Sequence, residues 1–124
     1  MLIADDSVRV LVVEDEESYR EALLMGLTKE GYAVELAADG LEGLRMFSAD
    51  PPDIVLLDVL LPGMNGTEVC RRMRELAPVP VIMVTALRGD GLENKARASG
   101  SVCLIKKPFQ TDALVGCLQQ ALRT

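Results

Sequence analysis

The sequence contains no histidine and no tryptophan, and aromatic residues make up only 3% of its 124 residues. Catalytic triads that use histidine, and metal sites with imidazole ligands, are therefore excluded within this chain. The hydrophobic fraction is nevertheless 49%, so one domain of this length can bury a core without disulfides or a structural metal. That core must consist mainly of Leu, Val, Ile, Met and Ala side chains.

Cysteine is scarce, and the spacing of the cysteines fits neither a disulfide framework nor a zinc site. Cys70, Cys103 and Cys117 are odd in number and far apart, and no Cys-x-x-Cys pair occurs. The sequence therefore predicts neither a zinc site nor a disulfide framework. We interpret the three cysteines as small, buried apolar residues.

Long apolar runs and an excess of basic residues are also lacking. No stretch approaches the roughly 20 apolar residues of a membrane span, and residues 1–10 do not have the pattern of a signal peptide. The net charge of −6 argues against direct binding of nucleic acid or of an anionic membrane surface by this chain. We expect a cytoplasmic protein without membrane contact.

The most informative stretch is a short apolar segment that ends in one carboxylate. Residues 53–57 are almost uninterruptedly apolar, and Asp58 follows them directly. Pro62 and the glycines at 63 and 66 then indicate a turn. Such a pattern is typical of a strand buried on both faces. Open α/β sheets bind ligands at the carboxyl ends of such strands, which makes Asp58 the first candidate functional residue.

Short apolar strands alternate with helical patterns along the chain. The predicted strands are residues 8–13, 33–37, 53–58, 78–85 and 102–105, and the predicted helices are about 18–30, 40–50, 67–76, 92–99 and 111–122. Thr111 or Asp112 is expected to cap the last helix. Alternation with short connections predicts an α/β fold: a single doubly wound (βα)5 domain, whose five-stranded parallel sheet of order 2-1-3-4-5 has helices on both faces. The domain is expected to span residues 1–124, with a core at about 8–122.

Chemically active residues stand at the carboxyl ends of four of the five predicted strands. In that strand order, the carboxyl ends bring together Glu14 and Asp15, Asp58, Thr85, and Lys107. Two carboxylates about 4 Å apart repel by about 4 kcal/mol at an effective dielectric constant of about 20. A cation can relieve this repulsion, and an all-oxygen site without His or Cys favours Mg²⁺.

The same set of residues suggests phosphoryl chemistry. A magnesium ion beside Asp58, with Lys107 opposite, would offset the charge of an arriving phosphoryl group. Asp58 would then act as a carboxylate nucleophile and form an aspartyl phosphate, while Thr85 would donate a hydrogen bond to a phosphoryl oxygen. Glu16 and Glu17 are better interpreted as solvated acids at a helix N-terminus.

Four motifs together resemble the receiver domain of two-component response regulators: VLVVEDE, DIVLLDVLLPGMNG, PVIMVTA and LIKKPF. The resemblance implies that Asp58 is the phosphoacceptor and that Thr85 and Lys107 contact the phosphoryl group. It also implies that Asp15 and Asp58 bind Mg²⁺ (or Mn²⁺) directly, that Glu14 binds it through water, and that the backbone carbonyl of Leu60 completes the protein ligands. The Lys107–Pro108 peptide bond is expected to be cis.

The resemblance also implies the partners. The phosphoryl donor would be a phosphohistidine on a sensor histidine kinase or a histidine phosphotransfer protein, and the signal would pass to an output domain or protein. The chain would be no enzyme in the usual sense, since it would catalyse only its own phosphorylation and slow dephosphorylation. It can stand alone or form the N-terminal part of a longer regulator with a C-terminal output domain.

Some positions depart from the family pattern. Leu104 stands where an aromatic residue is usual, so the coupled movement of an aromatic ring and Thr85 cannot operate in the usual way. Cys103 and the glutamines at 119 and 120 do not supply the salt bridges with which one branch of transcription factors dimerises. A degenerate receiver that acts as an interaction module independent of phosphorylation is therefore the alternative. Because Leu60 and Leu87 are both apolar, we expect slow self-dephosphorylation.

Overall fold

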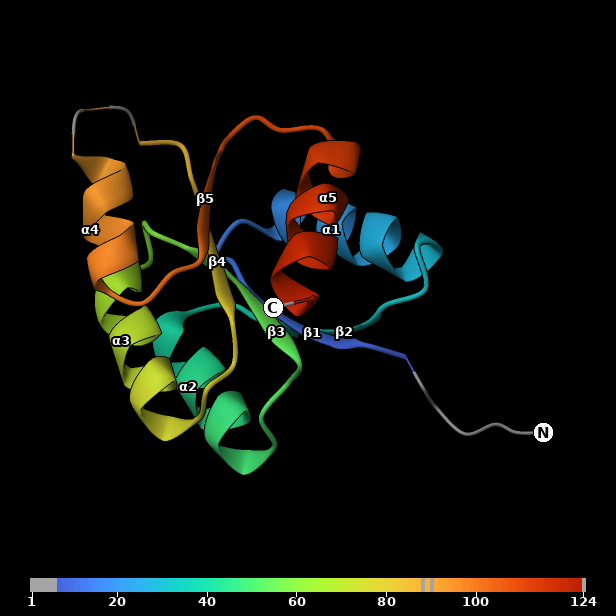
Figure 1. The fold of residues 1–124 in the computed structure, drawn as a ribbon. Helices are drawn as coiled ribbons and strands as arrows, with labels where there is room; N and C mark the ends of the chain where they lie inside the picture. Colours follow the sequence, from blue (N-terminus) through green and yellow to red (C-terminus); the bar gives the residue numbers. More distant parts are fainter. Residues whose placement is uncertain (1–6, 88, 90, 124) are drawn as a thin grey trace.

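The computed structural model describes residues 7–87, 89 and 91–123 of the chain. Five strands alternate with five helices in these residues (Figure 1). In chain order they are β1 (Arg9–Val13), α1 (Glu17–Lys29), β2 (Ala33–Ala37), α2 (Gly40–Ala49), β3 (Ile54–Asp58), α3 (Gly66–Leu76), β4 (Val81–Thr85), α4 (Leu92–Ala98), β5 (Cys103–Lys106) and α5 (Thr111–Leu122).

The strands form one parallel sheet of order β2-β1-β3-β4-β5. The predicted fold class and strand order are thereby confirmed. The strand order reverses between β1 and β3, which are paired neighbours with Val13 opposite Leu57. The carboxyl ends of these two strands therefore lie side by side at the switch point of the sheet, where α/β folds place their ligands.

Helices cover both faces of the sheet, with α1 and α5 on one side and α2, α3 and α4 on the other (Figure 1). Successive residues of β3 divide between two cores because strand side chains alternate between faces. Val55 and Leu57 pack with α2 and α3, including Phe47 of α2, whereas Ile54 and Leu56 pack with α1 and α5. Both faces of β3 are therefore buried, as its continuous apolar sequence predicts.

The start of the fourth strand and the cap of the last helix are the main differences from the sequence prediction. The fourth strand begins at Val81 rather than at residue 78, because Pro78 and Pro80 have no backbone N–H to donate to a neighbouring strand. The expected cap of the last helix is wrong: Thr111 is already helical, Asp112 lies in the first turn, and Gln110 occupies the cap position without a side-chain hydrogen bond.

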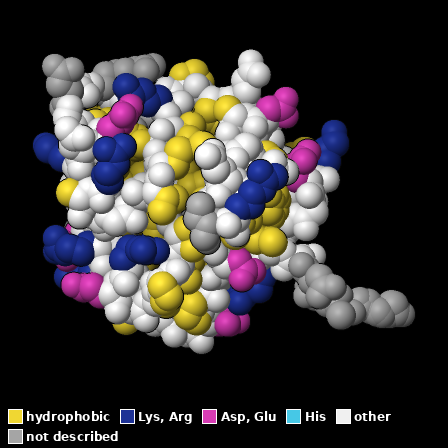
Figure 2. All heavy atoms as spheres, in the orientation of Figure 1, with side chains coloured by type: hydrophobic (Ala, Val, Ile, Leu, Met, Phe, Trp, Pro, Cys, Tyr) yellow, Lys and Arg dark blue, Asp and Glu magenta, His cyan; other side chains and the backbone are white. Residues whose placement is uncertain are grey.

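The surface between α4 and α5 exposes the edge of the sheet at β5. Figure 2 shows apolar side chains along this face and Lys and Arg side chains over α3 and α4. Val102, just before β5, is 52% exposed, and Leu104 is half-buried. Among the described residues, no helix is both long enough and apolar enough to cross a membrane.

Candidate functional site

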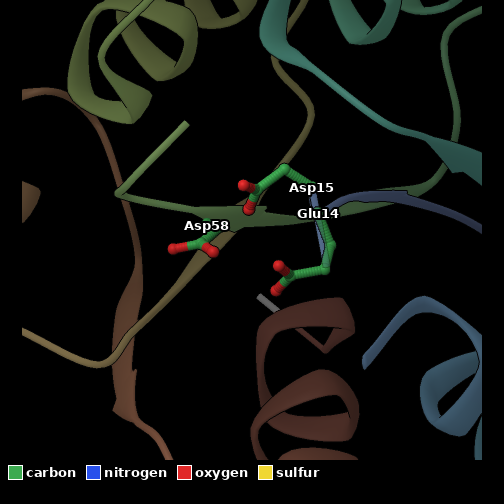
Figure 3. A group of neighbouring side chains, drawn as sticks. All are labelled: Glu14, Asp15 and Asp58. Atoms are coloured by element: carbon green, nitrogen blue, oxygen red, sulfur yellow. The ribbon is translucent and has the colours of Figure 1, made fainter. Parts of the chain in front are cut away.

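Three carboxylates converge where β1 and β3 end. Glu14 and Asp15 follow β1 directly, and Asp58 is the last residue of β3. Each offers one oxygen, and these three oxygens all lie within 4.8 Å of one another. Figure 3 shows the three side chains pointing toward a common space. The register of two neighbouring parallel strands is the cause, because it places residues 14, 15 and 58 at one edge of the sheet.

The three acids differ in exposure. Glu14 and Asp58 are buried, with 2% and 5% of their surface exposed, whereas Asp15 is exposed. The Leu60 amide donates a hydrogen bond of 3.0 Å to Oδ1 of Asp58, and the Glu16 amide donates one of 3.0 Å to Oε2 of Glu14. Backbone donors therefore orient both buried carboxylates, while Asp15 faces the solvent side of the cluster.

Lys107 directly follows the edge strand β5 and brings a positive charge into this cluster. Its Nζ donates hydrogen bonds to Oε1 of Glu14 at 2.6 Å and to Oδ2 of Asp58 at 3.1 Å. Oε1 of Glu16 lies 3.8 Å from the same nitrogen. Lys107 is only 5% exposed, so its ion pairs are little screened by solvent. One ammonium thus joins the acids of two strands.

Burial and neighbouring charges both shift the pKa values of Glu14 and Lys107. Burial raises the pKa of Glu14, and the neighbouring Asp58 raises it further, against the hydrogen bonds from Lys107 and the Glu16 amide. Burial by itself would lower the pKa of Lys107, but the hydrogen bonds and charges of Glu14 and Asp58 outweigh it, so this pKa is raised. Lys107 is therefore a permanent cation at neutral pH.

Thr85 is the last residue of β4, the strand that pairs with β3. It is fully buried, and it follows Val84, which is paired with Asp58. Its hydroxyl accepts a hydrogen bond of 3.0 Å from the Leu87 amide. Its carbonyl accepts one of 2.7 Å from the Lys107 amide. The end of β4 is thereby joined to the residue that carries the ammonium.

The loop after β3 is shaped by a close backbone contact. The Gly66 amide donates a 2.9 Å hydrogen bond to the carbonyl of Val59. A Cβ at Gly66 would overlap the carbonyl oxygen of Asp58 and lie 2.7 Å from Cα of Val59. Only glycine fits there. Leu60, in the same loop, is 51% exposed.

The structure also contains features that the sequence analysis did not assign to the site. The Lys107 ammonium lies 4.0 Å from the centre of the Tyr19 ring, and this ring is 6.1 Å from that of Phe109. Tyr19 belongs to the apolar face of α1, so its spacing marked it only as a core residue.

The expected cis peptide bond between Lys107 and Pro108 is present.

The donor set fits a hard divalent cation. The cluster brings three carboxylates and one ammonium together, and its candidate ligand atoms are all oxygens. An excess of negative charge remains after Lys107 is counted. Mg²⁺ prefers such carboxylate sites and keeps part of its water shell, which suits a cluster with one acid open to solvent.

The family model and curated proteins of similar sequence indicate the same family. The model of the "Response regulator receiver domain" matches residues 10–119. The transcriptional regulatory protein CseB of Streptomyces coelicolor is 44% identical over 119 residues, which are 95% of this chain and 50% of that protein. The response regulator MprA of Mycobacterium tuberculosis is 38% identical over 118 residues, 94% of this chain and 51% of that protein. The chain thus spans about half the length of the curated relatives it matches.

Solved structures agree with the sequence comparison. A CheY-like receiver domain protein from Methanospirillum hungatei has a TM-score of 0.91 at 29% identity, over 95% of both chains. The chemotaxis protein CheY4 of Vibrio cholerae has a TM-score of 0.87 at 30% identity, over 93% of this chain and 98% of that one.

Proposed function

Because this chain belongs to the response regulator receiver domain family, matched over residues 10–119, we propose that Asp58 accepts a phosphoryl group in a reaction that depends on Mg²⁺. The observation that carries the proposal is the contact of Asp58 with its surroundings. One carboxylate oxygen is held by the Leu60 amide, and the other by the Lys107 ammonium. The nucleophile is thereby fixed beside a buried positive charge.

The reaction transfers a phosphoryl group from nitrogen to oxygen. A carboxylate oxygen of Asp58 forms the new P–O bond, while the P–N bond of a phosphohistidine donor breaks and the imidazole leaves with its electron pair. The donor belongs to a sensor histidine kinase or a histidine phosphotransfer protein, since this chain has no histidine. When bound, Mg²⁺ (or Mn²⁺) offsets the charge of the phosphoryl oxygens.

The residues of the site take separate roles in this proposal. Asp15 and Asp58 would hold the metal directly, Glu14 would hold it through water, and the backbone carbonyl of Leu60 would provide a further ligand. Lys107 pairs with the phosphoryl group. Because Lys107 is bonded to Glu14 and Asp58 before the reaction, a phosphorylated Asp58 must redirect one of these contacts.

Thr85 connects the site with the rest of the domain. We assign to its hydroxyl, which accepts a hydrogen bond from the Leu87 amide, a second hydrogen bond that it donates to a phosphoryl oxygen. Movement of the hydroxyl toward that oxygen would stretch its contact with the Leu87 amide. Stretching of this contact would alter the start of the segment between β4 and α4. This change is the conformational signal that a downstream domain or protein reads.

The wider role follows from the relatives. CseB is named a transcriptional regulatory protein, and this chain matches only half of it. We propose that the chain works in the cytoplasm as the N-terminal receiver domain of a longer regulator with a C-terminal output domain. The acidic net charge of −6 assigns any contact with DNA to the output domain rather than to this one.

The proposal is tested with a small phosphodonor. The chain is incubated with acetyl phosphate, with and without Mg²⁺, and the intact mass and the modified peptide are measured. We expect one added phosphoryl group on Asp58 with Mg²⁺, and none after chelation or in Asp58→Asn. Asp53→Asn is the matched control, because Asp53 is an exposed acid just before the same strand. Phosphoryl transfer in Asp58→Asn at the wild-type rate would contradict the proposal.

A degenerate receiver is the second candidate, favoured by Leu104. This residue is half-buried against the core beside α4 and lines a hollow of about 240 Å³ with Ala96 and Arg97 of α4. A beryllofluoride complex distinguishes the candidates, because it mimics an aspartyl phosphate without a kinase. Binding that requires Mg²⁺ supports the phosphoacceptor, whereas its absence in the folded protein supports an interaction module.

A further inference from the structure

Two cysteine thiols meet between β5 and α5, on the side of the sheet away from α2, α3 and α4. Sγ of Cys103, the first residue of β5, lies 3.0 Å from Sγ of Cys117 in α5. The two elements run beside each other in Figure 1. Both cysteines are reduced, and both are half-buried. Their separation of 14 positions in the sequence gave no indication of this contact.

From this contact we propose that Cys103 and Cys117 form a dithiol site that a peroxide oxidises to an intramolecular disulfide. A disulfide bond is about 2.05 Å long, so the sulfur atoms need to approach by about 1 Å. The pair lies at the margin of the core that α1 and α5 cover.

The surroundings assign different roles to the two thiols. Burial, together with the hydrogen bond and charge of Cys117, raises the pKa of the Cys103 thiol to about 11. Cys103 therefore keeps its proton near neutral pH, and we assign the first attack to Cys117. Cys70 is fully buried in the opposite core, so it provides an internal control.

The reaction balances with one molecule of hydrogen peroxide. The sulfur of Cys117 attacks one peroxide oxygen, the O–O bond breaks, and the thiol proton leaves with the second oxygen as water, giving a sulfenic acid. The sulfur of Cys103 then attacks the sulfenic sulfur, the S–O bond breaks, and hydroxide leaves with the proton of Cys103 as a second water. Two thiols are oxidised by two electrons, and the peroxide is reduced by two.

The disulfide bond would attach the edge strand β5 to a second element of the fold. Within the described residues, β5 pairs in the sheet only with β4. A disulfide from Cys103 to Cys117 would fix β5 to α5 as well, and it would shorten the free chain of the unfolded state. We therefore expect a higher melting temperature for the oxidised chain.

Tryptic mapping tests the proposal directly. The reduced chain is treated with hydrogen peroxide, remaining thiols are blocked with N-ethylmaleimide, and the protein is digested with trypsin without reductant. Cleavage after Lys106 separates the two cysteines into peptides 98–106 and 107–123. We expect these peptides to be linked, with a mass about 2 Da below their sum, and to separate after treatment with dithiothreitol. Cys70 stays reduced in the folded protein and is blocked only after denaturation.

Matched variants give the controls. Cys103→Ser and Cys117→Ser are expected to lose the link, and Cys70→Ser is expected to keep it, with circular dichroism verifying that each variant is folded. If the folded wild-type chain keeps both thiols reduced under peroxide, the proposal is overturned. A sulfinic acid on one cysteine alone, or a link only between two chains on a non-reducing gel, overturns it equally.

Discussion

The ammonium of Lys107 lies 3.1 Å from Oδ2 of Asp58, although the two residues are 49 positions apart in the sequence. The contact exists because β3 and β5 both deliver their carboxyl ends to the same edge of the sheet, one strand apart. Both side chains are 5% exposed. A buried charge pair of this kind is costly to break from one side, since the remaining charge keeps its desolvation penalty.

In the absence of metal, replacement of Lys107 by Met should destabilise the domain. Glu14 and Asp58 would lose their shared cation and repel each other in a buried site, at a cost of about 3 kcal/mol in the free energy of unfolding. Added Mg²⁺ should recover part of this loss. Urea denaturation with and without Mg²⁺ measures both effects. Lys106→Met is the matched control, because it removes the same charge from an exposed neighbour; an equal loss in both variants would contradict the prediction.

Tyr19 should support Lys107 through the face of its ring. The ring centre is 4.0 Å from Nζ, within the range of a cation–π interaction worth about 0.5–2 kcal/mol. Tyr19→Leu should therefore lower the free energy of unfolding by about 1 kcal/mol more than Tyr19→Phe, which keeps the ring. If the two variants are equally stable, the ring contributes packing alone.

The sequence predicted the fold and the convergence of the acids with Lys107 at the candidate site, but not how their side chains pair. Strand order followed from apolar runs and short connections, and the acids of residues 14, 15 and 58 followed from the ends of those runs. The hydrogen bonds of Lys107 to Glu14 and Asp58 depend on rotamers and on packing over Tyr19, which spacing along the chain does not encode. The contact of Cys103 with Cys117 likewise depends on how α5 lies on β5.

Gly66 should be intolerant of any side chain. A Cβ there would overlap the Asp58 carbonyl, and relief of the overlap would move the loop that follows Asp58. We expect Gly66→Ala to cost about 2 kcal/mol or more of unfolding free energy and to slow phosphorylation by acetyl phosphate. Gly116→Ala is the control, because a Cβ at Gly116 meets nothing within 4 Å; on α5 this change should stabilise by about 0.5–1 kcal/mol. Wild-type stability in Gly66→Ala would refute the packing argument.

Tyr32 should make stability depend on alkaline pH. Burial, and to a lesser degree the charge of Glu30, raises the pKa of Tyr32 above its ordinary value of 10.0. The folded state therefore holds the phenol proton more tightly than the unfolded state does. The resulting stabilisation is fully present below pH 10.0 and is lost as the pH rises through the folded-state pKa. Relative to Tyr32→Phe, the unfolding free energy of the wild type should be constant below pH 10 and fall above it. A difference that stays constant to pH 11 would contradict this.

Leu60 should keep the aspartyl phosphate long-lived. Its amide is bonded to Asp58 and the residue is 51% exposed, so we expect its side chain to border the space where an attacking water would have to be oriented. An apolar side chain offers that water no hydrogen bond, whereas an amide would hold it near the phosphorus atom. Leu60→Asn should therefore raise the rate of phosphoryl loss several-fold, measured as the decay of the phosphorylated mass after the phosphodonor is removed. Leu60→Met is the control, since it keeps the size and the apolar character; an unchanged or slower decay in Leu60→Asn would show that water orientation is not governed from this position.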